Sequence, residues 1–207
     1  MEYKHLIDLA GRRPIVLGSG SPRRVTLLKE TGIEFAQVIP QLAEVQLPGE
    51  QPYEYAVRLA RDKARWVAGR VESDKLVIGC DTIVVLEDCV CEKPHDEDEA
   101  LDTLCLLSGK EHVVCTALAI VSAGHVVTSG HELTRVFFNE VTVERIKQYI
   151  ATGEPLDKAG AYGIQGMGAF LVDRIEGNLD NVIGLPKCLL ERMAKEIIEN
   201  HEVWRQP

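Results

Sequence analysis

The chain has 207 residues, of which 45% are hydrophobic and 27% charged, a composition that indicates a globular protein and excludes an intrinsically disordered one. Its net charge of −9 argues against non-specific binding of nucleic acid, although a local cluster of cations could still hold a small anionic ligand. No apolar window approaches the roughly 20 residues of a membrane helix, and residues 1–14 lack the apolar core of a secretory signal, so we expect a cytoplasmic protein.

Alternating strands and helices are predicted along the chain. The predicted strands are 14–18, 35–39, 76–79, 83–86, 90–91, 113–121, 126–138, 170–175 and 182–183, and the predicted helices are 22–31, 53–71, 96–107, 143–151 and 186–200. The strands predicted over 113–121 and 126–138 should form a hairpin that turns at Ala123 and Gly124. This order predicts an α/β fold with a mixed twisted sheet, flanking helices and two lobes around a cleft.

Cysteine and histidine spacing predicts no metal site. The six cysteines form no C-x-x-C pair, and the six histidines form no H-E-x-x-H pattern. Buried, reduced thiols of a cytosolic protein are the simpler interpretation.

The segment from Ser19 to Arg24 combines small residues with two arginines at the start of a helix. Ser21 should be the N-cap and Pro22 the first helical residue. Free N–H groups, the positive end of the helix dipole and two guanidinium groups suit a polyphosphate. The alternative is a capped surface helix with two solvated arginines.

Lys63 falls on the apolar stripe of the helix predicted over 53–71. A lysine on the inward face needs either a path to solvent or an anionic partner.

Asp81 follows the apolar run 76–79, where the carboxyl end of a strand would face a ligand crevice. A carboxylate there could hold a divalent cation or accept a proton from water, although an aspartate that starts a turn is the commoner case. Lys93, between Glu92 and Pro94, could neutralise phosphate, or it could lie in an exposed charged turn.

Residues 157–166 form a glycine-rich stretch that also carries Tyr162 and Gln165. A polar amide beside an aromatic ring could read the edge of a nucleobase. Alternatively, the stretch is a connection whose tyrosine merely packs.

Together these patterns resemble the Maf family from about Pro14 to Lys195. The matching motifs are S-x-S-P-R-R from Ser19, R-L-A-x-x-K-A from Arg58, G-x-D-T from Gly79, E-K-P from Glu92, D-K-A-G-x-Y-G-I-Q-G from Asp157 and G-L-P from Gly184. We therefore assign residues 1–13 to an N-terminal extension and residues 14–207 to one Maf-like domain.

The resemblance implies a fold related to inosine-triphosphate pyrophosphatases, and an enzyme, commonly dimeric, that uses a divalent metal to cut nucleoside triphosphates between the α- and β-phosphates. It implies that Asp81 accepts the proton and that Mg²⁺ or Mn²⁺ is held by Asp81 and Glu44, the latter placed by its spacing from Arg58. The implied polar or phosphate-contacting residues are Ser19, Arg23, Arg24, Glu44, Lys63 and Lys93.

Arg23, Thr82 and Gln165 match the subgroup that acts on dTTP and UTP. A sibling subgroup that resembles 7-methyl-GTP pyrophosphatases carries Trp, Gln and Glu at these positions. A glutamine amide both donates and accepts hydrogen bonds, as the edge of uracil or thymine requires. Two alternatives remain: a 7-methyl-GTP pyrophosphatase, and a nucleotide-binding inhibitor of septum formation that acts without turnover.

Overall fold

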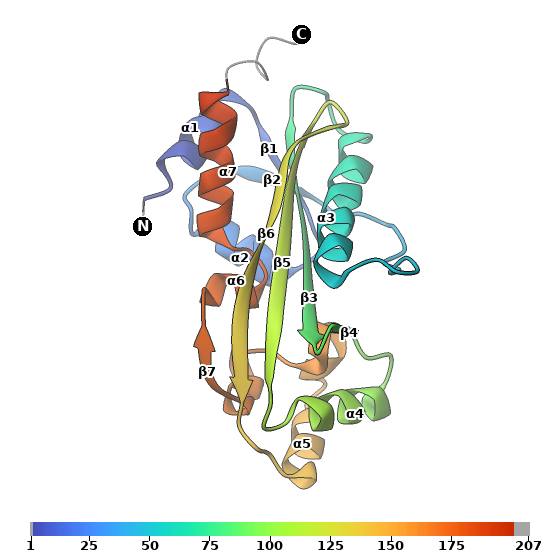
Figure 1. Ribbon diagram of the computed structural model, residues 1–207. Coiled ribbons are helices and arrows are strands. Elements are labelled where there is room, and N and C mark those ends of the chain that lie inside the picture. Colours follow the sequence, from blue (N-terminus) through green and yellow to red (C-terminus); the bar gives the residue numbers. More distant parts are fainter. Residues whose placement is uncertain (1, 201–207) are drawn as a thin grey trace. The chain divides into compact units, whose positions relative to one another are not determined.

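The computed structural model describes residues 2–200 and has a mixed α/β architecture (Figure 1). The strands are β1 (Ile15–Gly18), β2 (Phe35–Val38), β3 (Leu76–Leu86), β4 (Cys89–Cys91), β5 (Glu111–Ser122), β6 (His125–Phe138) and β7 (Val172–Glu176). The α-helices are α1 (Lys4–Arg12), α2 (Pro22–Lys29), α3 (Pro52–Ala68), α4 (Glu97–Leu107), α5 (Val143–Ile150), α6 (Leu179–Ile183) and α7 (Lys187–Glu199). Short 3₁₀ helices lie at Glu154–Asp157, Ala159–Ala161 and Gly166–Leu171.

Within residues 2–200 the sheet has seven strands, in the order β2-β1-β3-β5-β6-β7, with β4 paired to β3. Strand β1 runs parallel to both β2 and β3, whereas β4 and β7 pair antiparallel with β3 and β6. The predicted mixed sheet is therefore confirmed. The predicted hairpin is also present, since Ala123 and Gly124 both have the positive φ that a tight two-residue turn requires.

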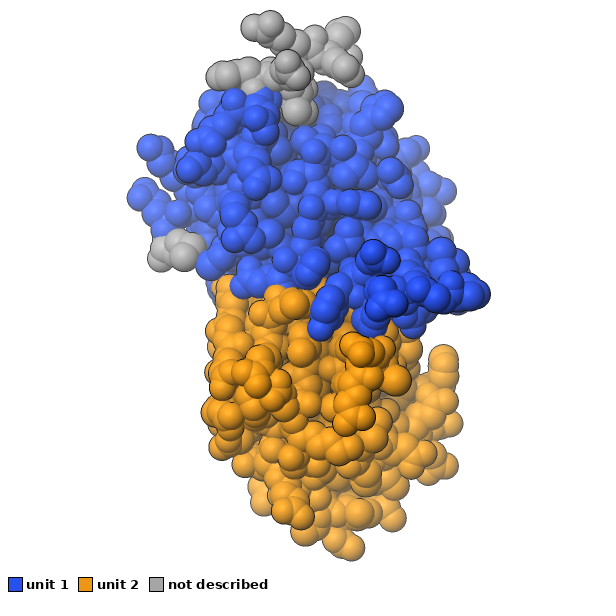
Figure 2. All heavy atoms as spheres, viewed as in Figure 1, with its two compact units in different colours: residues 1–81, 116–132, 184–207 blue, residues 82–115, 133–183 orange. Residues whose placement is uncertain are grey.

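The chain divides into two compact units, which Figure 2 colours separately. The first unit comprises the residues up to 81, residues 116–132 and the residues from 184 onward. The second comprises residues 82–115 and 133–183. The division falls inside strands β3, β5 and β6, so each of these strands contributes residues to both units.

Tight packing of α3 on β3 organises the first unit. All four residues of β1 and the first six of β3 are buried. A Cβ atom on Gly79 would lie 2.2 Å from the carbonyl oxygen of Ala60 and 2.8 Å from the Cβ of Ala64. Only glycine allows this approach, because any larger residue would push the helix away from the strand.

Helix α1 packs beside α7 in the first unit (Figure 1). It buries Leu6 and Leu9, and the Glu191 carboxylate accepts hydrogen bonds of 2.9 Å from the N–H groups of His5 and Leu6. These are first-turn donors that a local N-cap side chain would normally satisfy. Part of the segment assigned from sequence to an extension is thus a helix within this unit.

An aromatic cluster lies in the core of the second unit. His112, Phe138 and Tyr162 contact one another edge-to-face, with ring centroids 4.7–5.4 Å apart. The Nε2 atom of His112 lies 2.8 Å from the Tyr162 hydroxyl. Gly160 packs against Val84 so closely that a Cβ atom would lie 2.8 Å from Cγ2 of that valine.

Two predicted elements are wrong. The break after residue 79 is absent, because β3 continues to Leu86 with Asp81 and Thr82 inside it. Residues 182–183 belong to helix α6 rather than to a strand. Oδ1 of Asn178 accepts the N–H of Asp180 at 2.9 Å and so begins that helical turn. This turn outweighs the strand preference of the β-branched Val182 and Ile183.

Among residues 2–200, no helix combines the length and apolar character needed to cross a membrane.

Candidate active site

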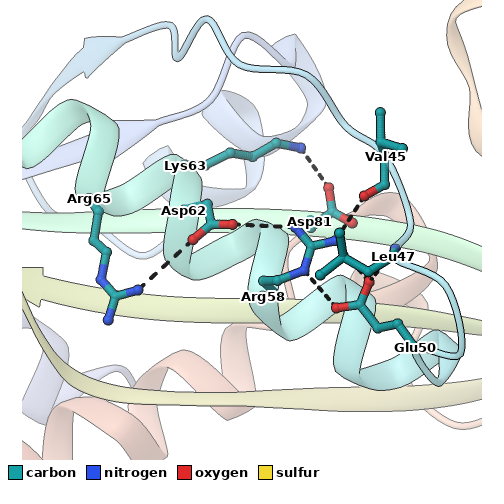
Figure 3. A network of polar contacts seen from close by, with 8 residues as sticks. All are labelled: Val45, Leu47, Glu50, Arg58, Asp62, Lys63, Arg65 and Asp81. Atoms are coloured by element: carbon teal, nitrogen blue, oxygen red, sulfur yellow. Dashed lines mark hydrogen bonds and ion pairs between the residues drawn. The ribbon is translucent and has the colours of Figure 1, made fainter.

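Lys63, Asp81 and Glu44 meet in the first unit. The Lys63 ammonium lies 2.6 Å from Oδ1 of Asp81 and 2.8 Å from Oε1 of Glu44. Lys63 and Asp81 are both buried, and Figure 3 shows the lysine reaching from α3 to the strand. Of the two possibilities that the sequence left open for an inward-facing lysine, a path to solvent or an anionic partner, the structure shows the anionic partner.

Asp81 reaches this position because of its place on β3. Gly79 and Asp81 are two residues apart, so they share the face of the strand that α3 covers. The expected strand end at Asp81 is wrong for β3. However, β1 ends at Gly18, which pairs with Gly79, so Asp81 lies two residues beyond the carboxyl end of the parallel neighbour.

One oxygen of Asp81 has no hydrogen-bond donor among the described residues. Its Oδ2 is buried and accepts no hydrogen bond from residues 2–200. Buried carboxylate oxygens are normally paired. This oxygen is therefore suited to accept a bond from water, or to bind a cation, while Oδ1 stays with Lys63.

Arg24 ties the start of α2 to β3 beside Asp81. Its Nη1 donates to Ser19 Oγ and to the carbonyl of Cys80, both at 3.1 Å, and its Nε donates to the carbonyl of Gly184 at 2.9 Å. Three segments that are distant in the sequence thereby converge on one guanidinium group. Arg23, the next residue towards the N-terminus, is half-buried.

The start of α2 differs from the expected cap. Ser21 occupies the N-cap position, but its side chain makes no capping bond with the described residues. Instead, its N–H donates to Ser19 Oγ at 3.2 Å. Ser19 is buried, and Gln37 Nε2 donates to its carbonyl at 2.8 Å. The structure thus places Ser19 as a link between the loop and Arg24.

Arg58 fastens the segment that follows Glu44 (Figure 3). Its Nε and Nη2 bind the two carboxylate oxygens of Glu50 at 2.6 and 2.8 Å, and Nη2 also donates to the carbonyl of Val45 at 2.8 Å. Glu50 in turn accepts the N–H of Leu47 at 3.0 Å. The hydrogen bonds from Arg58 hold the pKa of Glu50 below its usual value.

Sequence reasoning missed this clamp. Arg58 belongs to the R-L-A-x-x-K-A motif, but nothing local marks Glu50, eight residues earlier, as its partner. The consequence is geometric: Val45, whose carbonyl Arg58 binds, is bonded directly to Glu44. One helix therefore carries both the lysine that contacts Glu44 and the arginine that fixes its loop.

The other predicted residues lie in the second unit. Thr82 is half-buried on β3, directly after Asp81, while Lys93 and Gln165 are exposed. Gly160 donates its N–H to the carbonyl of Glu92 at 3.2 Å, which joins the E-K-P turn to the glycine-rich stretch. That Lys93 and Gln165 act on the same ligand as Asp81 stays a prediction.

The described residues offer only carboxylates of the cluster as candidate ligands for a metal ion at this site. Residues 2–200 contain no cluster of three or more His, Cys, Asp or Glu side chains able to hold a metal ion. Asp81 and Glu44 nevertheless offer the hard oxygen donors that Mg²⁺ prefers. This ion is commonly bound by one or two carboxylates, waters and substrate phosphates, so the pair is compatible with it.

A family model and the sequences of known proteins both relate this chain to Maf-like proteins and dTTP/UTP pyrophosphatases. A family model described as Maf-like protein matches residues 14–197. The dTTP/UTP pyrophosphatase of Desulfitobacterium hafniense (strain Y51) is 46% identical over 194 residues, covering 91% of this chain and 87% of that protein. The protein of the same name from Escherichia coli (strain K12) is 42% identical over 192 residues, covering 93% and 95%.

Among solved structures, a nucleoside-triphosphatase (dITP/XTP pyrophosphatase) from Mycobacterium abscessus is similar with a TM-score of 0.44 and 12% identity, over 93% of this chain and 100% of that one. The sequence relationship is much closer, since the family model spans most of the chain and the bacterial relatives align almost end to end. This chain is a member of the Maf-like protein family.

Proposed function

We propose that the chain is a nucleoside triphosphate pyrophosphatase that hydrolyses dTTP and UTP, and modified uridine nucleotides, to the monophosphate and pyrophosphate. Relatives named dTTP/UTP pyrophosphatase match the chain at 42–46% identity over most of its length. The observation that carries the proposal is Asp81, a buried carboxylate with one oxygen bound to Lys63 and the other without a hydrogen-bond partner among residues 2–200.

The reaction requires water to attack the α-phosphorus and pyrophosphate to leave with the electrons of the α–β anhydride bond. Asp81 Oδ2 accepts a proton from the attacking water, while Lys63 fixes the carboxylate through Oδ1. Arg23, Arg24 and the first turn of α2 counter the negative charge of the phosphates. The bonds from Arg24 to Ser19 and Cys80 hold its guanidinium group in place before the nucleotide arrives.

Mg²⁺ or Mn²⁺ is the proposed cofactor, held by Asp81 and Glu44. When bound, it would reduce the charge of the triphosphate and of the leaving pyrophosphate. Glu44 is exposed and contacts Lys63, so its carboxylate is accessible from solvent and lies in the same cluster as Asp81.

Substrate choice is assigned to Arg23, Thr82 and Gln165, with Lys93 as a further phosphate contact. The exposed amide of Gln165 can both donate and accept, which matches uracil and thymine, whereas a glutamate at this position could only accept.

We further propose a cytoplasmic homodimer. Light scattering after size-exclusion chromatography tests the dimer, and a monomeric mass would overturn it.

A substrate panel tests the function. Purified protein is incubated with dTTP, UTP, CTP and 7-methyl-GTP, with and without Mg²⁺, and products are separated by chromatography. We expect monophosphate and pyrophosphate in equal amounts from dTTP and UTP. Release of diphosphate and inorganic phosphate would contradict the position of cleavage, and binding without turnover would identify a nucleotide-binding protein instead. Preference for 7-methyl-GTP would assign the chain to the sibling subgroup.

A further inference from the structure

Glu154 is a half-buried carboxylate that lies at the centre of the loop carrying Gln165. Its Oε2 accepts the N–H of Met167 at 3.0 Å, and its Oε1 accepts the N–H of Gly168 at 3.2 Å and the hydroxyl of Tyr149 at 3.0 Å. These are bonds from neutral donors to a charged acceptor, which are stronger than ordinary amide–carbonyl bonds.

Tyr149 extends the same anchor to the other side of Gln165. Its buried hydroxyl donates to Glu154 and accepts the N–H of Gly163 at 3.0 Å. Burial, together with the bond to Glu154, raises the pKa of Tyr149, so the hydroxyl keeps its proton and its role as donor. The backbone is therefore fixed at residue 163, before Gln165, and at residues 167 and 168, after it.

The glycines of this loop are explained by the same pair. A Cβ atom on Gly163 would lie 3.1 Å from Oε1 of Glu154, and one on Gly166 would lie 3.0 Å from Oε2. On Gly168, a Cβ atom would lie 2.5 Å from the Tyr149 hydroxyl. Three glycines thus allow the chain to wrap closely around one carboxylate and one phenol.

This arrangement limits what the loop can do. The N–H groups of residues 163, 167 and 168 already have acceptors, so they are not free to bind phosphate as the N–H groups of a glycine-rich phosphate loop are. The loop presents the side chains of Gln165 and Met167 to solvent, and Gln165 lies between the two fixed points.

We infer that Glu154 is a positioning residue that sets nucleobase preference by fixing the backbone on both sides of Gln165, with Tyr149 as its partner. This inference rests on the proposed function, in which Gln165 contacts the base. Glu154 itself does not contact the substrate. Its carboxylate acts through the conformation of residues 163–168.

The test uses Glu154→Gln, which keeps the shape of the side chain but places an NH₂ group where a backbone N–H needs an acceptor. Tyr149→Phe removes the second anchor. Glu144→Gln is the matched control, because Glu144 is an exposed acid in the first turn of the neighbouring helix α5. For each protein, kcat and KM are measured with dTTP, UTP and 7-methyl-GTP.

We expect Glu154→Gln to raise the KM for dTTP about tenfold, to change kcat less than threefold, and to narrow the preference for dTTP over 7-methyl-GTP. Tyr149→Phe should act in the same direction with a smaller effect, and Glu144→Gln should match the wild type. Equal losses of turnover on all three nucleotides, with preference unchanged, would overturn the inference in favour of a purely structural role.

A second measurement does not depend on activity. Hydrogen exchange of the peptide covering residues 163–169, followed by mass spectrometry, should accelerate at least tenfold in Glu154→Gln and stay unchanged in Glu144→Gln. Unchanged exchange would refute the anchor itself. If exchange accelerates but the wild type turns over no nucleotide, the proposed function fails while the anchor stands.

Discussion

Two loops of this protein are fixed by charged side chains in opposite ways. Residues 44–50 in the first unit are held by Arg58, a cation that binds the carboxylate of Glu50 and one carbonyl. Residues 163–168 in the second unit are held by Glu154, an anion that binds backbone N–H groups. The first contact is chiefly an ion pair, whereas the second is chiefly a set of main-chain hydrogen bonds.

Because the two loops are held by different kinds of contact, they should respond differently to salt and to substitution. An ion pair between partly exposed side chains is screened by salt and is worth little unless it is bidentate, as Arg58 and Glu50 are. Hydrogen bonds from the backbone to a carboxylate depend less on salt and more on close packing, which is why the second loop needs glycines. The first loop carries Glu44 and should affect turnover, while the second carries Gln165 and should affect substrate choice.

The largest effect is expected from Asp81→Asn. The amide cannot accept a proton from water, so kcat for dTTP should fall at least ~100-fold, as expected when a general base is removed. Pyrophosphate release is the measurement, and Asp98→Asn, a change at an exposed acid on α4, is the control. Full activity in Asp81→Asn would show that the cluster of Lys63, Asp81 and Glu44, to which the first loop contributes Glu44, is not the catalytic site.

Gln165→Glu should have the next largest effect. A carboxylate cannot donate to the base, so kcat/KM for dTTP should fall about 30-fold, which corresponds to the roughly 2 kcal/mol that an unpaired polar group costs. Competition between dTTP and 7-methyl-GTP in one reaction measures the change directly. If the ratio of dTTP to 7-methyl-GTP consumed stayed unaltered, Gln165 would have no role in base recognition. The second loop would then not affect substrate choice.

Arg58→Ala should reduce kcat about tenfold, because Glu44 loses the clamp on its neighbour Val45. Preference between nucleotides should stay as in the wild type, in contrast to Glu154→Gln. Arg58→Lys should restore little, since an ammonium group cannot form the bidentate pair. Arg61→Ala, a change at an exposed arginine on the same helix, is the control. A shift in preference with Arg58→Ala would break the proposed division between the two loops.

The smallest effect concerns pH, which should act on His112 in the second unit and not on the Arg58–Glu50 pair in the first. Burial lowers the pKa of His112 to about 4, whereas the unfolded chain should protonate near the usual value of 6.5. Protons therefore bind the unfolded state first, and stability should fall as the pH drops from 6.5 towards 4, by about 2 kcal/mol at pH 5. The Arg58–Glu50 pair should persist there, because the pKa of Glu50 is lowered.

Urea unfolding at pH 7.5 and pH 5 measures this loss of stability. His112→Gln should be less stable at neutral pH, because it gives up the ring contacts with Phe138 and Tyr162. It should nevertheless lose less stability between the two pH values than the wild type does. Equal losses in the two proteins would show that His112 does not cause the acid sensitivity.

The α/β alternation and the hairpin at Ala123 and Gly124 were predictable from the sequence alone. The sequence also indicated that Lys63, on the inward face of its helix, needs either a path to solvent or an anionic partner. These features depend on residues a few positions apart, through hydrophobic periodicity and turn geometry. The motifs also placed the chain in its family, which the match over residues 14–197 supports.

Which side chains contact one another could be learned only from the folded chain. Helix α1 is capped by Glu191, 186 residues away from His5, and Arg24 joins β3 to Gly184. Glu154 carries no signal of its own, since its role depends on donors up to 14 residues further along a folded loop. Hydrogen bonds and ion pairs act at a few ångströms, so partners that are distant in sequence cannot be identified until the backbone path brings them together.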